Sequence, residues 1–223
     1  MGSISDNLSA IRQSLPAGVT LVAVSKFHPA ESLMEAYNAG QRNFGESRVQ
    51  ELSAKAPQLP ADINWHFIGH LQTNKVRQLL RLRPALIESI DSERLLNAID
   101  NEAAAQGIIQ NVLMQVHVAR EETKFGFSPD ELMEYFRARR FENLKATHIC
   151  GLMGMASNTD DNDRVSADFR AIAHTHRAIT GICPDLRGFG TISMGMSHDY
   201  PLAVAGGSNM VRVGTAIFGE RQY

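Results

Sequence analysis

The sequence has few cysteines, few aromatic residues, no long apolar run and no excess of either charge. Cys150 and Cys183 are the two cysteines among 223 residues, and no CxxC pair is present. This count excludes a disulfide framework and is typical of a reduced, cytosolic protein. No apolar stretch approaches the roughly 18 residues of a transmembrane helix, so we expect no membrane span.

The balance of charge excludes a further class of partner. The chain carries 22 basic and 24 acidic side chains, for a net charge of −2. Without a basic patch there is no electrostatic case for nucleic acid or an anionic membrane as the main partner. The first residues lack the features of a signal peptide and predict an amphipathic helix capped by Ser5 or Asp6. We therefore expect a cytoplasmic protein.

What the sequence does contain is a regular alternation of short β-rich runs and helical patterns. Gly40 and Gly107 follow two of the helical patterns, at the position where glycine commonly ends a helix. The predicted helices include 29–39, 92–105 and 161–179, and the predicted strands are 20–25, 42–45, 64–69, 85–89, 111–116, 147–153, 191–195 and 210–214.

Eight strands alternating with helices predict an α/β fold with a parallel sheet. The open alternative is a doubly wound sheet, but eight strands in a chain of this length favour a closed (β/α)8 barrel. No linker-like segment divides residues 1–223, so we expect one domain.

In such a barrel, chemistry is expected at the carboxyl ends of the strands. The run "TLVAVSK" places Lys26 directly after the first strand, where an interior-looking segment ends on a cation. Gly195, Ser197, Gly214 and Thr215 follow the seventh and eighth strands, where this fold commonly binds phosphate. A turn with an ordinary helix cap is the simpler interpretation of those loops. Arg212 alternates with two valines in the eighth strand, which predicts a second cation beside Lys26 and a phosphorylated aldehyde as ligand.

These residues also carry a family resemblance. The motifs "VAVSK" (22–26), "FGES-VQE" (44–51), "WHFIGHLQTNK" (65–75), "K-G" (124–126), "GLM" (151–153) and "SMGMSHD…GGSNMVRVGTAIFGER" (193–221) resemble the pyridoxal 5′-phosphate (PLP) homeostasis protein family. That family is similar to the N-terminal barrel domain of alanine racemase. The resemblance runs in order over essentially the whole chain.

The resemblance implies a cofactor and a set of contacts. PLP would be held as a Schiff base on Lys26, with its phosphate on Ser197, Gly214 and Thr215 and with Arg212 close to the ring. From the residues themselves, Gly195 belongs to the predicted phosphate loop, and Met194 or Met196 could pack on the edge of the ring, although methionines more often fill irregular space in a core. The family usually has asparagine where this chain has Ser47, so we expect a gap beside the cofactor that water fills. Arg48 likewise replaces a tyrosine.

The residues leave three functions open. The first, which we favour, is a PLP-binding protein of vitamin B6 and amino-acid homeostasis without robust catalysis, because the chain ends at Tyr223 and provides no second domain carrying an opposing tyrosine base. The second is a racemase-like PLP enzyme with Tyr200 as its base, although we favour the interpretation of Tyr200 as an exposed or loop-packing residue. The third is a cofactor-free Schiff-base aldolase. We expect neither catalytic residues nor a metal site. The expected partners are PLP and PLP-dependent apo-enzymes, and the expected oligomeric state is a monomer.

Overall fold

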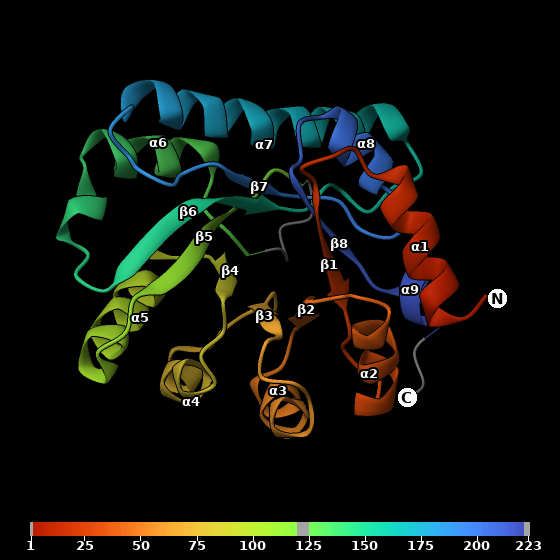
Figure 1. Cartoon of the computed structure of the whole chain (residues 1–223). Helices are drawn as coiled ribbons and strands as arrows, with labels where there is room; N and C mark the ends of the chain where they lie inside the picture. The colour runs from red at the N-terminus through yellow and green to blue at the C-terminus, as the bar shows by residue number, and fades with distance from the viewer. Residues whose placement is uncertain (1, 120–124, 221–223) are drawn as a thin grey trace.

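The protein folds as a closed parallel barrel with helices on its outside (Figure 1). The computed structural model describes residues 2–119 and 125–220. The strands of the described part run around the barrel in chain order, and β1 closes the ring by pairing with β8, with Val22 opposite Arg212. The strands are β1 (Thr20–Val24), β2 (Asn43–Glu46), β3 (Asn64–Phe67), β4 (Leu86–Ile90), β5 (Gln110–Val116), β6 (Thr147–Gly154), β7 (Thr191–Ser193) and β8 (Met210–Val213).

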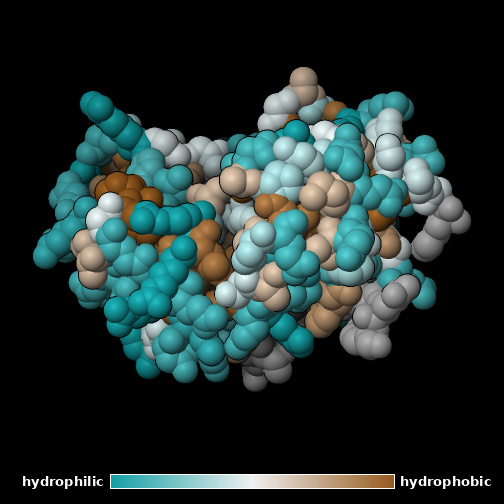
Figure 2. Space-filling view, turned by 60° about the horizontal axis from the view of Figure 1, so that its bottom comes forward, coloured by the Kyte–Doolittle hydropathy of each residue, from teal (hydrophilic) through white to brown (hydrophobic). Residues whose placement is uncertain are grey.

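The helices cover the outer faces of the strands (Figure 1), with α1 before β1 and each of the others after a strand. The face of the molecule seen in Figure 2 is mostly hydrophilic, with small hydrophobic patches. They are α1 (Ile4–Ser14), α2 (Ala30–Asn38), α3 (Val49–Lys55), α4 (Val76–Arg81), α5 (Glu93–Gln106), α6 (Pro129–Arg137), α7 (Asn162–Ile182), α8 (Tyr200–Ala205) and α9 (Thr215–Phe218), with 3₁₀ turns at Ala56–Gln58, Thr73–Lys75 and Arg140–Asn143. The closed ring confirms the predicted (β/α)8 barrel and rules out the doubly wound sheet.

One predicted helix start is wrong. The cap of α1 is Ser3 and neither Ser5 nor Asp6. The Ser3 hydroxyl oxygen accepts from the backbone N–H of Asp6, and the Asp6 carboxylate accepts from the backbone N–H of Ser3. Asp6 is therefore the third helical residue of a capping box, which the sequence pattern alone did not separate from the cap itself.

The barrel interior has an apolar floor. Val22, Leu86, Leu113, Met153 and Met210 form a buried cluster separate from the larger core between strands and helices. Since strand side chains alternate between faces, the residues two positions further along each strand also point inward. Those residues include Val24, Glu88 and Arg212. They form the next layer of the barrel interior, between the apolar cluster and the carboxyl ends of the strands.

Candidate functional site

A cavity of about 370 Å³ opens at the carboxyl ends of the strands. Six of the eight predicted site residues line it, namely Lys26, Ser47, Ser197, Arg212, Gly214 and Thr215. Apolar side chains supply much of the remaining wall, among them Val24, Ile68 and Met196. A concave, mostly apolar pocket with a few converging polar groups is the usual form of a small-molecule site.

Lys26 reaches the cavity because of where β1 ends. Val24 is the last residue of the strand and lines the cavity, and Lys26, in the turn that follows, lines it as well. The lysine is half-buried, whereas Ser25 before it is buried. A half-buried lysine amine in an apolar pocket is a candidate nucleophile toward an aldehyde.

The loops after β7 and β8 meet at one hydroxyl oxygen. The backbone N–H of Gly214 donates to Ser197 Oγ at 3.1 Å, and that of Ala216 donates to it at 3.4 Å. Together with the hydroxyls of Ser197 and Thr215, these two amides form a donor set suited to a phosphate oxygen. The residues present therefore fit the phosphate of PLP, on the side of the cavity that β7 and β8 provide.

Met194 and Gly195 lie behind the cavity wall and do not line it. Met194 is fully buried in the core between the strands and the helices, and Met196 is the methionine of this loop that lines the cavity. Gly195 has a φ of +97°, and a Cβ there would lie 2.6 Å from the Cβ of Ala203. Gly195 thus allows the loop to turn tightly over α8, and its carbonyl accepts from the Arg212 backbone N–H at 3.0 Å.

Ser47 stands at the end of β2, where two loops approach closely. A Cβ on Gly69 would lie 2.1 Å from the Ser47 carbonyl oxygen, so glycine is required at position 69 for this contact. Both residues line the cavity. The predicted water beside the Ser47 hydroxyl remains a prediction. Arg48 is exposed, with its guanidinium carbon 4.8 Å from the centre of the Phe27 ring.

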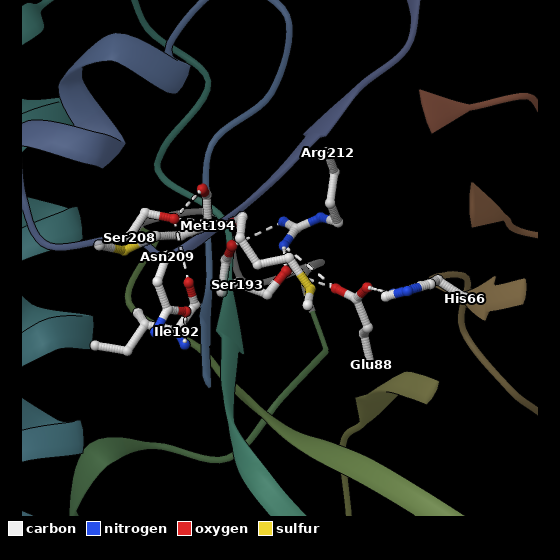
Figure 3. Close-up of polar contacts among 10 residues, drawn as sticks. His66, Glu88, Ile192, Ser193, Met194, Ser208, Asn209 and Arg212 are labelled. Atoms are coloured by element: carbon white, nitrogen blue, oxygen red, sulfur yellow. Dashed lines mark hydrogen bonds and ion pairs between the residues drawn. The ribbon is translucent and has the colours of Figure 1, made fainter. Parts of the chain in front are cut away.

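Arg212 is held by a buried polar network below the cavity (Figure 3). Its Nη1 donates to Ser193 Oγ at 2.6 Å, and its Nη2 donates to the Gly154 carbonyl at 2.9 Å. Ser193 Oγ in turn donates to Glu88 Oε2 at 2.6 Å, and Glu88 Oε1 lies 2.7 Å from His66 Nδ1.

The network compensates the charge of the arginine. Arg212 Nη1 lies 3.6 Å from Glu88 Oε2, and both side chains are buried. Burial tends to raise the pKa of Glu88, but hydrogen bonding and charge from His66, Arg212 and Ser193 outweigh it and hold that pKa below its usual value. Lys26 and Arg212 both line the cavity, and the charge of Arg212 is compensated there by a buried carboxylate.

Glu88, Ser193 and His66 are the residues that the sequence reasoning missed. Glu88 interrupts the apolar strand "ALIES" at the position that faces inward together with Leu86, and this was the signal that could have identified it. The described residues contain no group of three or more side chains suited to a metal ion.

The tyrosines of the described chain lie away from the cavity. The Tyr200 hydroxyl is 2.9 Å from Ser14 Oγ of α1, on the outside of the barrel. Tyr37 donates to Asp62, and Tyr135 is buried in the outer core. None of these three lines the cavity, so the candidate base Tyr200 is misplaced for chemistry there. Lys124 of the "K-G" motif and Tyr223 lie outside the described residues.

Comparison with known proteins gives three consistent findings. The family described as "Alanine racemase, N-terminal domain" matches residues 1–222. The chain is 40% identical over 220 residues to the pyridoxal phosphate homeostasis protein of Schizosaccharomyces pombe, covering 96% of this chain and 89% of that protein. It is 37% identical to PipY of Synechococcus elongatus, solved with PLP bound. The TM-score is 0.90, and the match covers 97% of this chain and 100% of that one.

A more distant structural likeness concerns the fold alone. Alanine racemase from E. faecalis is 18% identical, with a TM-score of 0.72, and the likeness covers 97% of this chain but 57% of that one. The shared part is the barrel.

Proposed function

The chain belongs to the pyridoxal phosphate homeostasis protein family and to the wider alanine racemase N-terminal domain family, and from this premise we propose that it binds PLP for intracellular PLP and amino-acid homeostasis. Lys26 would hold the cofactor as a Schiff base, and catalysis would be weak or absent. The observation that carries the proposal is that one cavity is lined by Lys26 and by Ser197, Gly214 and Thr215, at a point where the amides of Gly214 and Ala216 converge on Ser197 Oγ.

The Lys26 amine suits the aldehyde of PLP, and the loops after β7 and β8 suit its phosphate. The Lys26 amine would bond to the aldehyde carbon as a C=N bond, with the aldehyde oxygen and both amine protons lost as water. The backbone amides of Gly214 and Ala216, which now donate to Ser197 Oγ, would hold the phosphate together with the hydroxyls of Ser197 and Thr215. When bound, PLP supplies an electron sink for carbanions.

Weak catalysis is proposed because of the side chains that surround the cavity. An amino-acid racemase needs an acid–base group on each face of the cofactor, and Lys26 provides one. In the described part of the chain no tyrosine lines the cavity to provide the other. Arg212 is buried and lines the cavity. Beside the ring nitrogen, as the family resemblance implies, its charge would disfavour protonation of that nitrogen and so weaken the electron sink.

The partners and location follow the same reasoning. Among the described residues, no helix is both long enough and apolar enough to cross a bilayer. PLP-dependent apo-enzymes as recipients, a monomeric state and a cytoplasmic location remain predictions from the sequence. Size-exclusion chromatography with light scattering tests the second of these.

The proposal is tested by the visible spectrum of purified protein with added PLP. We expect an absorption band at a longer wavelength than that of free PLP. Borohydride should remove this band and leave one labelled peptide, which contains Lys26. Lys26→Ala should abolish both the band and the label, whereas Lys145→Ala, which removes an exposed amine before β6, should keep them. A protein that stays colourless with PLP would contradict the proposal and favour the cofactor-free aldolase. Turnover of D- or L-alanine lost in Lys26→Ala would favour the racemase.

A further inference from the structure

The residue after Lys26 has an unusual backbone conformation. Phe27 has a φ of +68°, in the left-handed region that favours glycine and is uncommon for a bulky side chain. It is the third residue of a four-residue turn closed by the His28 N–H donating to the Ser25 carbonyl at 3.1 Å. A positive φ at this position of a turn is normally provided by glycine or asparagine. Lys26 is the second residue of the same turn.

A buried ion cluster lies directly against this turn. Lys55 of α3 points its amine at three acceptors, which are the Ser25 carbonyl at 2.8 Å, Glu46 Oε1 at 2.7 Å and Glu51 Oε1 at 2.7 Å. These use the three donors that an ammonium group has. The exposed fractions of the Lys55 and Glu46 side chains are 8% and 0%, so the contacts are shielded from solvent.

The same cluster bonds to both neighbours of Lys26. Glu46 Oε1 accepts from the Ser25 hydroxyl at 2.7 Å, and Glu51 Oε1 accepts from the Phe27 backbone N–H at 2.5 Å. We refer to Lys55, Glu46 and Glu51, with the backbone groups of Ser25 and Phe27 that they bond, as the Lys55 clamp. The residue on each side of Lys26 is thus fixed by one buried cluster that does not line the cavity.

We propose that Glu51 and Lys55 are positioning residues that hold the turn at Phe27 in its left-handed conformation and thereby aim the Lys26 amine into the cavity. Strained backbone persists where surrounding contacts determine it, and here the contact on the Phe27 N–H is a charge-assisted hydrogen bond. Removing that acceptor allows Phe27 to relax toward the ordinary β or α region. Because the turn has only four residues, such a relaxation rotates Lys26 as well.

The inference rests on the proposed reaction of Lys26 with PLP but concerns residues outside the cavity. It also gives a role to the buried cluster of two carboxylates and one ammonium group. Burial raises the pKa of Glu46, which disfavours its charged form. Glu46 Oε2 is buried without a hydrogen-bond partner in the described structure.

The test measures how fast Lys26 is labelled. Wild-type protein and its variants are treated with PLP and, separately, with non-phosphorylated pyridoxal, reduced with borohydride, and the Lys26 peptide is quantified by mass spectrometry. Glu51→Ala should slow labelling by both aldehydes about tenfold, the size expected when a strained turn relaxes. Glu51→Gln keeps an acceptor for the Phe27 N–H and should stay within about threefold of wild type.

The decisive comparison removes the strain. Glycine tolerates a positive φ, so Phe27→Gly in the Glu51→Ala background should restore labelling to within about threefold of wild type. If the cluster has only a general stabilising role, Glu51→Ala should lower the unfolding midpoint equally with Phe27 and with Gly at position 27, and the rate of Lys26 labelling should not change. That result would overturn the proposal. Glu35→Gln on α2 is the matched control, because Glu35 contacts the backbone of Ile4 on the outer surface.

A second measurement needs no variant. The Phe27 amide should be protected in hydrogen exchange of the wild-type protein, because it donates to Glu51. Exchange at the rate of an unstructured amide would overturn the proposal. If wild-type Lys26 is not labelled by PLP at all, the proposed function fails. If it is labelled and the Glu51→Ala rate is equal, only the clamp fails.

Discussion

Glu88 shows how one residue beneath the cavity determines the electrostatics of the site. Its two carboxylate oxygens are divided between His66 on one side and Ser193 with Arg212 on the other. A guanidinium buried in a barrel is costly unless a carboxylate compensates it. The position of Arg212 in the cavity wall therefore depends on a residue that does not line the cavity.

We predict that Glu88→Gln destabilises the protein by about 3 kcal/mol at pH 7, because it leaves a buried, uncompensated arginine. The free energy of unfolding from urea titration measures this directly. Glu134→Gln is the matched control, since Glu134 pairs with Arg140 at the surface and 72% of its side chain is exposed. Equal unfolding midpoints for Glu88→Gln and wild type would mean that another group compensates Arg212.

At the scale of elements, the loop between β7 and α8 places Ser197 where the amides of Gly214 and Ala216 reach it. The turn depends on Gly195, whose φ of +97° and contact with Ala203 exclude a Cβ. The following residue Met196 returns to the cavity wall. Gly195, which does not line the cavity, is thus necessary for the position of Ser197 and of the amides that contact it.

Gly195→Ala should lower the free energy of unfolding by at least about 2 kcal/mol, because strain at positive φ adds to a steric clash. The opposite result is expected for Gly181→Ala near the end of α7, where a Cβ meets nothing within 4 Å. That variant should stabilise the protein by about 0.5 kcal/mol through helix propensity. Chemical denaturation of the two variants side by side tests both signs, and a stable Gly195→Ala would refute the steric argument.

The elements themselves were largely predictable. The run "VLMQV" and its counterparts are short, β-rich and bounded by polar residues, so the strands and the ends of α2 and α5 lie within about two residues of the predicted bounds. The closure of the barrel followed from the number of strands. The cap of α1 did not follow, because Ser3, Ser5 and Asp6 are all good capping residues and only the hydrogen bonds distinguish them.

At the scale of the whole molecule, the sequence predicted the side chains that face the cavity better than the contacts that hold them. Lys26 and Arg212 stand out in apolar strands, and barrel geometry alone places them at the mouth. The Lys55 clamp joins β1, β2 and α3, and the Glu88 network joins β3, β4, β7 and β8. Such pairings need the register of several strands at once, which no local pattern contains.

The stability of the whole molecule should also depend on pH through a histidine far from the cavity. His176 of α7 is buried and stacks on Phe189, with ring centres 4.7 Å apart, and its Nε2 has no hydrogen-bond partner in the described structure. Burial lowers its pKa below the usual 6.5, with a smaller opposing effect from the Phe189 backbone. The unfolded chain therefore binds a proton at a pH where the folded protein does not.

The sign of the effect follows from that difference. As the pH falls below about 6.5, the free energy of unfolding should decrease, and the decrease should end once the pH passes the lowered pKa of folded His176. Glu46, whose pKa is raised, acts in the opposite direction above its usual 4.5, so a comparison of variants is needed to isolate the histidine. His176→Gln should flatten the dependence between pH 6.5 and 5, whereas the exposed His174→Gln on the same helix should leave it unchanged. Urea unfolding at half-unit pH steps measures the three curves, and parallel curves for His176→Gln and wild type would show that His176 titrates alike in both states.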